Sequence, residues 1–454
     1  MKRGSILIKN GTIFTMNAKK EIIQGDILIK DGVIAAVGTV EEQAEQVVDA
    51  SGKLVLPGFI QTHVHLCQAL FRGLADDVDV VDWLKGRIWP LESAHDEQSI
   101  NASAYLAAAE MIAGGTTTAL TMETALHTDG VMAAVEDAGL RVFTGNAMMD
   151  VVEPGTEMRA LDTEGSFQET RRLFETWHGR DGGRIRCAVM PRGARNCSPE
   201  LVERSRRFAQ DNGLLMHTHV SENGPLSHRL KRTTGLTDMK LLEQQKVAGE
   251  RLVIAHAVWL DEGDMEIVRS RGVKIAHCPS ANLKLASGFA KIPELLDSGV
   301  TIGLGADGAP CNNNMDMMTE IRLASLMHKP RCGPTALPAD RMLEMATIEG
   351  ARCLGIEKET GSLEVGKRGD VILMRHDGLH CSPMTGVPLS SKIVYSLKGT
   401  DVDTTIVDGR ILYQNRRFTA LDERKIVDES NRQMENVLKR TPFGEELLRT
   451  GILG

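Results

Sequence analysis

The stretch Pro57-Gly58-Phe59-Ile60-Gln61-Thr62-His63-Val64-His65 places two histidines at the end of an apolar run. We expect a buried strand over residues 54–60, with both histidines just beyond its carboxyl end. Side chains two residues apart in an extended chain point to the same side, so two imidazoles can hold one cation there. Alone the pair is weak evidence, because about 0.4 such H-x-H pairs arise by chance at this histidine content.

Three later apolar runs also end in a polar residue that can bind a metal. His219 ends the first, His256 the second and Asp307 the third, at intervals of 37 residues (219 to 256) and 51 residues (256 to 307). These intervals suit one strand-helix unit and then two. Because the carboxyl ends of parallel barrel strands open at one mouth, we predict that His63, His65 and these three residues share a metal.

The composition favours small-molecule chemistry. The chain has 454 residues, of which 42% are hydrophobic and 25% charged, as in a soluble globular protein. The net charge of −8 argues against a general nucleic-acid binder. Eight scattered cysteines without a C-x-x-C pair indicate reduced thiols in a cytoplasmic protein. We expect no membrane span or secretory signal, and we expect a homo-oligomer.

Both ends of the chain have the texture of short antiparallel strands. Turn pairs such as Asn10-Gly11, Asp31-Gly32 and Asp408-Gly409 separate short apolar segments. Between the two ends, strand candidates alternate with amphipathic helices, predicted over residues 99–113, 199–212, 262–271 and 338–354. The prediction is an α/β protein: a (β/α)8 TIM barrel over residues 58–362, a discontinuous small β-sandwich from residues 1–57 and 363–425, and a helical extension over 426–454.

Several motifs together resemble the amidohydrolase superfamily over nearly the whole chain. Besides the H-x-H stretch, they are G-G-T-T-T at 114–118, H-x-x-E at 219–222, H-C-P-S-A-N at 277–282, G-A-D-G at 305–308 and G-S-L-E-V-G-K-R-G-D at 361–370. The segments L-F-R-G-L-A-D-D at 70–77, W-P-L-E at 89–92 and N-N-N-M-D-M at 312–317 resemble the branch of adenosine-type and chlorohydrolase-like enzymes. That branch includes S-adenosylhomocysteine and 5′-methylthioadenosine deaminases.

The resemblance implies one divalent metal. His63, His65, His219 and Asp307 would be its ligands, and His256 would lie beside it and hydrogen-bond the reacting water. Three neutral imidazoles and a carboxylate suit zinc, with iron as the alternative. His217 also competes for a ligand role, because it stands two residues before His219.

The implied reaction is hydrolytic deamination of an aminated purine nucleoside, with hydroxide on the metal as the nucleophile. Glu222 would protonate the neighbouring ring nitrogen, and Asp307 would pass a proton to the departing amine. The alternative is a deaminase or chlorohydrolase of another nitrogen heterocycle: guanine, cytosine, a pterin or an s-triazine. Fold alone does not separate these substrates.

Substrate contacts are expected from Glu92, Arg192, Trp89, His277 and Asn282. By resemblance, Glu92 would accept hydrogen bonds from two vicinal sugar hydroxyls. Arg192 stands where adenosine-type relatives commonly carry a histidine, so the chain departs from the pattern there. An arginine at this place can bind an anionic substituent bidentately, which keeps a homocysteine-like tail open as a substrate feature.

Overall fold

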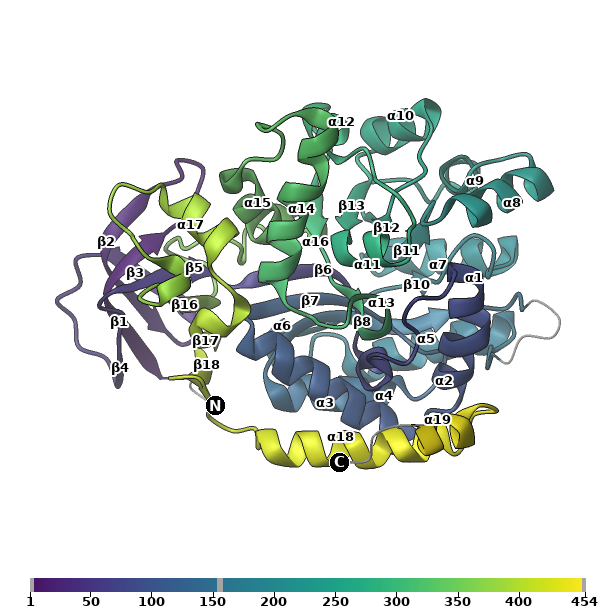
Figure 1. Ribbon diagram of the computed structural model, residues 1–454, viewed down its shortest axis with the longest axis horizontal. Coiled ribbons are helices and arrows are strands. Elements are labelled where there is room, and N and C mark those ends of the chain that lie inside the picture. Colours follow the sequence, from purple (N-terminus) through teal and green to yellow (C-terminus); the bar gives the residue numbers. More distant parts are fainter. Residues whose placement is uncertain (1–3, 153–157, 451–454) are drawn as a thin grey trace.

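The barrel strands form one parallel sheet at the centre of the molecule (Figure 1). In the computed structural model, which describes residues 4–152 and 158–450, the strand order is β10-β8-β7-β6-β14-β13-β12-β11; β15 also pairs with β6, and β9 with β8. The strands are β6 (Phe59–His65), β7 (Thr116–Glu123), β8 (Arg141–Met148), β9 (Ile185–Cys187), β10 (Met190–Pro191), β11 (Met216–Val220), β12 (Leu252–His256), β13 (Lys274–His277), β14 (Ile302–Leu304) and β15 (Asp307–Gly308).

The fold is TIM-barrel-like, but a regular strand pair does not close the sheet. Isolated parallel bridges, Val189 with Met216 and Gly193 with His219, connect the two outer segments instead. Helices cover the sheet: α3 (Glu97–Ala113), α4 (Thr128–Ala138), α5 (Thr163–Trp177), α7 (Pro199–Asp211), α8 (Gly224–Thr234), α9 (Asp238–Gln244), α10 (Glu262–Arg271), α11 (Pro279–Lys284), α12 (Ile292–Asp297), α13 (Ala309–Asn312), α14 (Met317–Cys332), α15 (Ala339–Ala346) and α16 (Ile348–Leu354).

Both chain ends contribute to a second, separate sheet, on the left of Figure 1. Its order is β19-β18-β17-β16-β5-β1-β2-β3, and β4 pairs with β1. The strands are β1 (Ser5–Phe14), β2 (Ile22–Lys30), β3 (Val33–Gly38), β4 (Gln46–Asp49), β5 (Lys53–Pro57), β16 (Val371–Arg375), β17 (Val402–Val407), β18 (Arg410–Gln414) and β19 (Arg417–Phe418). The pairing joins all nine strands in one sheet, so the predicted sandwich is not confirmed.

The strand predicted over 54–60 belongs to two sheets. β5 ends at Pro57 in the composite sheet, and β6 begins at Phe59 in the barrel. Gly58 lies between them against the side chain of Thr117, where a Cβ atom would collide. Because the chain changes sheets at Gly58, β6 starts at Phe59 and extends to His65. His63 and His65 therefore lie within the carboxyl-terminal part of β6, not beyond its end as predicted.

A buried ion pair ties the barrel to the composite sheet. Arg141 at the start of β8 donates from Nε to Asp370 Oδ2 at 2.9 Å and from Nη2 to Asp370 Oδ1 at 3.1 Å. Both side chains are at most 1% exposed, and the backbone N–H of Asp408 also donates to Asp370. A charge pair with this geometry fixes how the two sheets meet.

Three of the four predicted helices are confirmed within two residues at each end, and the fourth is divided. The segment predicted as one helix over 338–354 is split at Thr347, whose φ and ψ are −130° and −94°. The Thr347 hydroxyl donates to the carbonyl oxygen of Leu343 at 2.5 Å, which caps the first half. The predicted C-terminal extension forms α18 (Glu423–Leu438), which packs on α3, and α19 (Gly444–Thr450); residues 451–454 lie outside the described residues.

Two further expectations concern the whole chain. The eight cysteines are free thiols in this structure, and seven of them are buried. Within residues 4–152 and 158–450, no helix has both the length and the apolar character needed to cross a bilayer.

Candidate metal centre and active site

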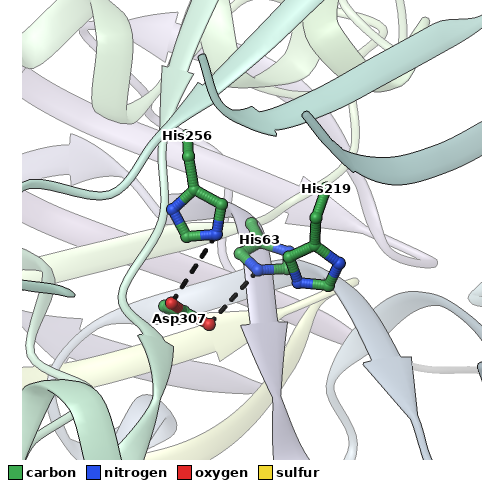
Figure 2. A group of neighbouring side chains, drawn as sticks. All are labelled: His63, His219, His256 and Asp307. Carbon is green, nitrogen blue, oxygen red and sulfur yellow. Dashed lines mark ion pairs between the residues drawn. The ribbon is translucent and has the colours of Figure 1, made fainter. Parts of the chain in front are cut away.

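The predicted site residues meet at the carboxyl ends of the parallel strands. His63 and His65 end β6, His219 lies near the end of β11, His256 is the last residue of β12 and Asp307 is the first of β15. Figure 2 shows the imidazoles of His63 and His256 beside the carboxylate of Asp307, with the imidazole of His219 next to that of His63. The phased positions in the sequence therefore correspond to one place in space.

The distances suit a single cation. One ligand atom from each of His63, His219, His256 and Asp307 lies within 4.8 Å of the others. Asp307 Oδ1 lies 3.2 Å from Nε2 of His63 and 3.2 Å from Nε2 of His65, while its Oδ2 lies 3.8 Å from Nε2 of His256. The Nε2 atoms of His63 and His256 are buried and have no hydrogen-bond partner among the residues that the structure describes. Such unpartnered lone pairs beside a carboxylate fit a divalent metal.

Each imidazole is oriented by a hydrogen bond at its other nitrogen. His65 Nδ1 lies 2.6 Å from the carbonyl oxygen of Met122, and His219 Nδ1 lies 2.7 Å from that of Arg192. His256 Nδ1 lies 3.0 Å from Oδ1 of Asn282. Because these oxygens only accept, each Nδ1 carries the proton and each Nε2 presents a lone pair to the centre.

His63 is oriented by a second histidine. His63 Nδ1 lies 2.7 Å from Nε2 of His217, and His217 Nδ1 lies 2.9 Å from the carbonyl oxygen of Val253. The carbonyl fixes the proton of His217 on Nδ1, so its Nε2 accepts from His63. His217 thus contacts a cluster member from outside the group of converging ligand atoms.

Burial favours the neutral form of two of the imidazoles, whereas at His65 the carboxylate of Asp307 outweighs burial and raises the pKa. Burial lowers the pKa of His63 to about 4, and it lowers the pKa of His219 well below its usual value, with further lowering from neighbouring imidazoles. Burial by itself raises the pKa of Asp307, but the neighbouring imidazoles of His63, His65 and His256 outweigh it and hold that pKa well below the usual range. Neutral imidazoles and an ionised carboxylate are the forms that bind a metal.

The backbone of the site is tightly constrained. His256 and Asp307 have φ values of 72° and 62°, in the left-handed region that residues other than glycine rarely adopt. Gly305 lies so close to the backbone of His63 that a Cβ atom would stand 2.5 Å from the carbonyl oxygen of His63. Strained backbone of this kind gathers at functional sites because the surrounding structure enforces it.

A pocket opens beside the cluster. Its lining includes Trp89, Arg192 and Glu222, as well as four of the strand-end residues, His65, His219, His256 and Asp307. Residues outside the predicted set also line it, among them Gln68, Arg195 and Asp238. Nothing in their local sequence marks them, since they reach the pocket only through the packing of separate loops and helices.

Three of the predicted substrate contacts lie outside the pocket lining. Asn282 bonds to His256 instead. His277 is fully buried, its two ring nitrogens have no hydrogen-bond partner, and its ring centroid is 5.6 Å from that of His328. Glu92 borders a separate, smaller cavity and forms an ion pair with Arg192.

The family follows from comparison with known proteins. A family model described as "Amidohydrolase family" matches residues 54–412, which is more than half of the chain. The chain belongs to the amidohydrolase family. This amidohydrolase carries within the matched range every residue proposed above as a ligand or acid.

Individual relatives match almost end to end. The amidohydrolase is 39% identical over 438 residues to a 5′-deoxyadenosine deaminase of Methanosarcina acetivorans, covering 96% of this chain and 99% of the relative. It is 38% identical over 416 residues to a 5-methylthioadenosine/S-adenosylhomocysteine deaminase of Thermococcus onnurineus, covering 91% and 95%. Its structure resembles that of an adenosine deaminase from Xanthomonas campestris with bound zinc, with a TM-score of 0.89, 27% identity and coverage of 96% and 98%.

Proposed function

We propose that this amidohydrolase is a metal-dependent hydrolytic deaminase of adenosine-type nucleosides. The observation that carries the proposal is the buried cluster of imidazoles and Asp307 in a pocket that Glu222 also lines. The near full-length similarity to two nucleoside deaminases supports the substrate class. Both relatives are named as deaminases of adenosine derivatives, and such enzymes release ammonia from the amino group of the purine.

We propose a single zinc ion, with iron as the alternative that the same ligand types allow. His63, His65, His219 and Asp307 would hold it, and His256 would lie beside it. The unpartnered Nε2 atoms of His63 and His256 and the zinc-bound structural relative support this assignment. When bound, zinc lowers the pKa of a water towards about 7, which supplies a nucleophile at neutral pH.

The reaction consumes one water and releases one ammonia. A C–O bond forms and the exocyclic C–N bond breaks at the same ring carbon. Glu222 donates a proton to the adjacent ring nitrogen, where negative charge develops during attack. Asp307 accepts a proton from the attacking water and returns it to the departing amino group, and His256 hydrogen-bonds the oxygen that is added. Glu222 regains its proton from the added hydroxyl as that oxygen becomes the product carbonyl.

The direct test is a metal assay combined with ammonia release from a substrate panel. The panel contains adenosine, 5′-deoxyadenosine, methylthioadenosine, S-adenosylhomocysteine, guanine, cytosine, a pterin and a chlorinated s-triazine. We expect activity with the adenosine derivatives, and loss of both metal and activity in His63→Ala and Asp307→Ala. Full activity of metal-free enzyme, or much faster turnover of a free base or triazine, would contradict the proposal.

We further propose a closed (β/α)8 barrel over residues 58–362, a composite β domain from 1–57 and 363–425, and a C-terminal extension. The bridges between residues 189–193 and 216–219 support closure of the barrel. A homo-oligomer in the cytoplasm is the assembly and location that we expect. Sedimentation of the purified protein tests the first of these, and cell fractionation tests the second.

A further inference from the structure

Two charged side chains of opposite sign meet in the wall of the pocket. Glu92 lies on α2 (Trp89–Ser93), and Arg192 follows β10. Arg192 Nη1 donates to Glu92 Oε2 at 2.6 Å, and Arg192 Nη2 donates to Glu92 Oε1 at 3.1 Å. The side chains are 9% and 7% exposed, so the pair is nearly dry. A buried bidentate pair holds both partners in one orientation.

Gln68 is the third member of this group. It lies on η1 (Leu66–Phe71), directly after the metal-ligand strand, and its Nε2 donates to Glu92 Oε1 at 2.7 Å. Arg192 and Gln68 line the pocket, whereas Glu92 is not among the lining residues. The two donors therefore border the pocket, whereas the carboxylate that they bond borders a separate cavity.

The hydrogen-bonding capacity of Glu92 is almost used up. An ionised carboxylate has about four lone-pair sites, and three of them accept from Arg192 and Gln68. One site remains, on Oε2. Two vicinal sugar hydroxyls need two acceptor sites, so Glu92 cannot receive both without giving up a bond that it already makes.

Arg192, in contrast to Glu92, keeps hydrogen-bonding groups that the pair does not use. A guanidinium carries five N–H donors, and Glu92 uses two of them. Glu92 also compensates its charge: burial alone lowers the pKa of Arg192, but the carboxylate of Glu92 outweighs this and raises it. The Glu92–Arg192 pair thus offers directed N–H donors without a spare positive charge of its own, which suits a neutral acceptor atom better than an anion.

We propose that Arg192 donates to a neutral acceptor atom of the nucleoside, and that Glu92 and Gln68 are positioning residues that hold its guanidinium rather than acceptors for the sugar diol. This inference rests on the proposed deamination of adenosine-type nucleosides. It replaces the expected anion contact of Arg192 with a contact that does not depend on the charge of the 5′ substituent. The carbonyl oxygen of Arg192 also orients His219, so the same residue links this wall to the cluster.

The first experiment needs no variant. We would measure kcat/KM of the metal-loaded wild-type enzyme for adenosine, 2′-deoxyadenosine and 3′-deoxyadenosine, together with binding of the three by calorimetry. Removal of either hydroxyl should change kcat/KM by less than about fivefold, because no full diol contact is lost. A loss of about 100-fold for both deoxynucleosides would overturn the inference while leaving the proposed function intact.

The second experiment separates positioning from direct contact. Glu92→Gln keeps the shape and one acceptor, and Arg192→Lys keeps the charge without the fork. Each should raise KM for adenosine about tenfold or more while changing kcat much less, and the double variant should be no worse than the poorer single variant, because both act through one unit. Additive losses, or a Glu92→Gln effect that vanishes with deoxynucleosides, would contradict the positioning role.

A third comparison tests the neutral contact. Arg192→Lys should reduce kcat/KM for methylthioadenosine and S-adenosylhomocysteine by the same factor, within about threefold. A loss confined to S-adenosylhomocysteine would show that Arg192 binds its charged tail and would overturn the inference. If the wild-type enzyme neither binds nor deaminates any adenosine derivative, the proposed function fails and the inference fails with it.

Discussion

Replacing His217 by Phe should weaken metal binding although His217 is outside the converging group of ligand atoms. The substitution removes the 2.7 Å bond that holds the proton of His63 on Nδ1. An unpartnered buried donor costs about 1–3 kcal/mol. The proton can avoid that cost by moving to Nε2, where Asp307 Oδ1 is 3.2 Å away and can accept it. A metal would then have to displace this proton before His63 could bind it.

The expected result is a zinc affinity about 10–100-fold lower than in the wild type, the usual consequence of losing a partner of a metal-bound histidine. That range corresponds to about 1.4–2.7 kcal/mol. The assay is competition for zinc against a chromogenic chelator, with the folded state checked by circular dichroism. The conservative variant His217→Gln should lose less, since an amide can accept from His63 and donate to the carbonyl oxygen of Val253.

The matched control is His178→Gln. His178 is also a histidine whose Nδ1 makes a hydrogen bond, in this case with the backbone N–H of Cys187 at 3.1 Å, but it is remote from the cluster. Its replacement should leave zinc affinity unchanged. The reasoning is refuted if His217→Phe binds zinc within about twofold of the wild type, or if His217→Gln is no better than His217→Phe.

Three other perturbations have defined outcomes. Glu222→Gln should keep its metal by elemental analysis and lose at least about 100-fold in kcat, the scale of a lost general acid; loss of metal would instead make Glu222 a ligand. Asp370→Ala should lower the free energy of unfolding by about 3–5 kcal/mol in a denaturant titration, because the buried Arg141 loses its bidentate partner and keeps only Asp408 Oδ1, 3.6 Å from its Nη2; Glu175→Ala, which breaks an exposed pair, should cost less than about 1 kcal/mol. Burial raises the pKa of Glu320 from 4.5 to about 7, so the folded protein keeps a proton that the unfolded chain has released, and stability should fall as pH rises between these values. Glu320→Gln should flatten that fall, and an unchanged pH profile would contradict the assignment.

The sequence could predict that His63, His219, His256 and Asp307 lie together, because the order of the strands determines where their ends meet. Parallel strands deliver their carboxyl ends to one edge, so polar residues at the ends of apolar runs meet whatever the intervening helices do. His219, His256 and Asp307 come from three strands, and each lies where its run ends. Only the spacing of strands had to be right, and spacing is visible in the sequence.

Boundaries between structures were harder to predict than the structures themselves. Residues 54–60 form one apolar run, yet the chain leaves one sheet at Pro57 and enters another at Phe59. Likewise, the helix predicted over 338–354 breaks at Thr347, although its apolar pattern continues. In both cases the surface against which the segment packs determines where the element ends. The spacing of apolar residues in the sequence does not show which surface that is.

The substrate wall shows a second limit of sequence reasoning. Glu92 and Arg192 were each expected to face the substrate, since a carboxylate and a cation near a pocket have obvious uses. They are 100 positions apart in the chain, and nothing local shows that each satisfies the other. Pairing between side chains of distant segments depends on the tertiary structure. The sequence could therefore indicate that both residues lie near the pocket, but it could not show that they bond to each other.

The four hydrogen bonds that orient the site imidazoles differ in whether a substitution can remove the acceptor. His65 and His219 donate to main-chain carbonyls, of Met122 and Arg192, which persist whatever side chain stands there. His63 and His256 depend on side chains, those of His217 and Asn282. Substitution can therefore disturb the proton position directly in only two of these four rings. Because the Nε2 atoms of these two rings lie beside the carboxylate of Asp307, the outer side chains His217 and Asn282 control the lone pairs that the two rings present to it.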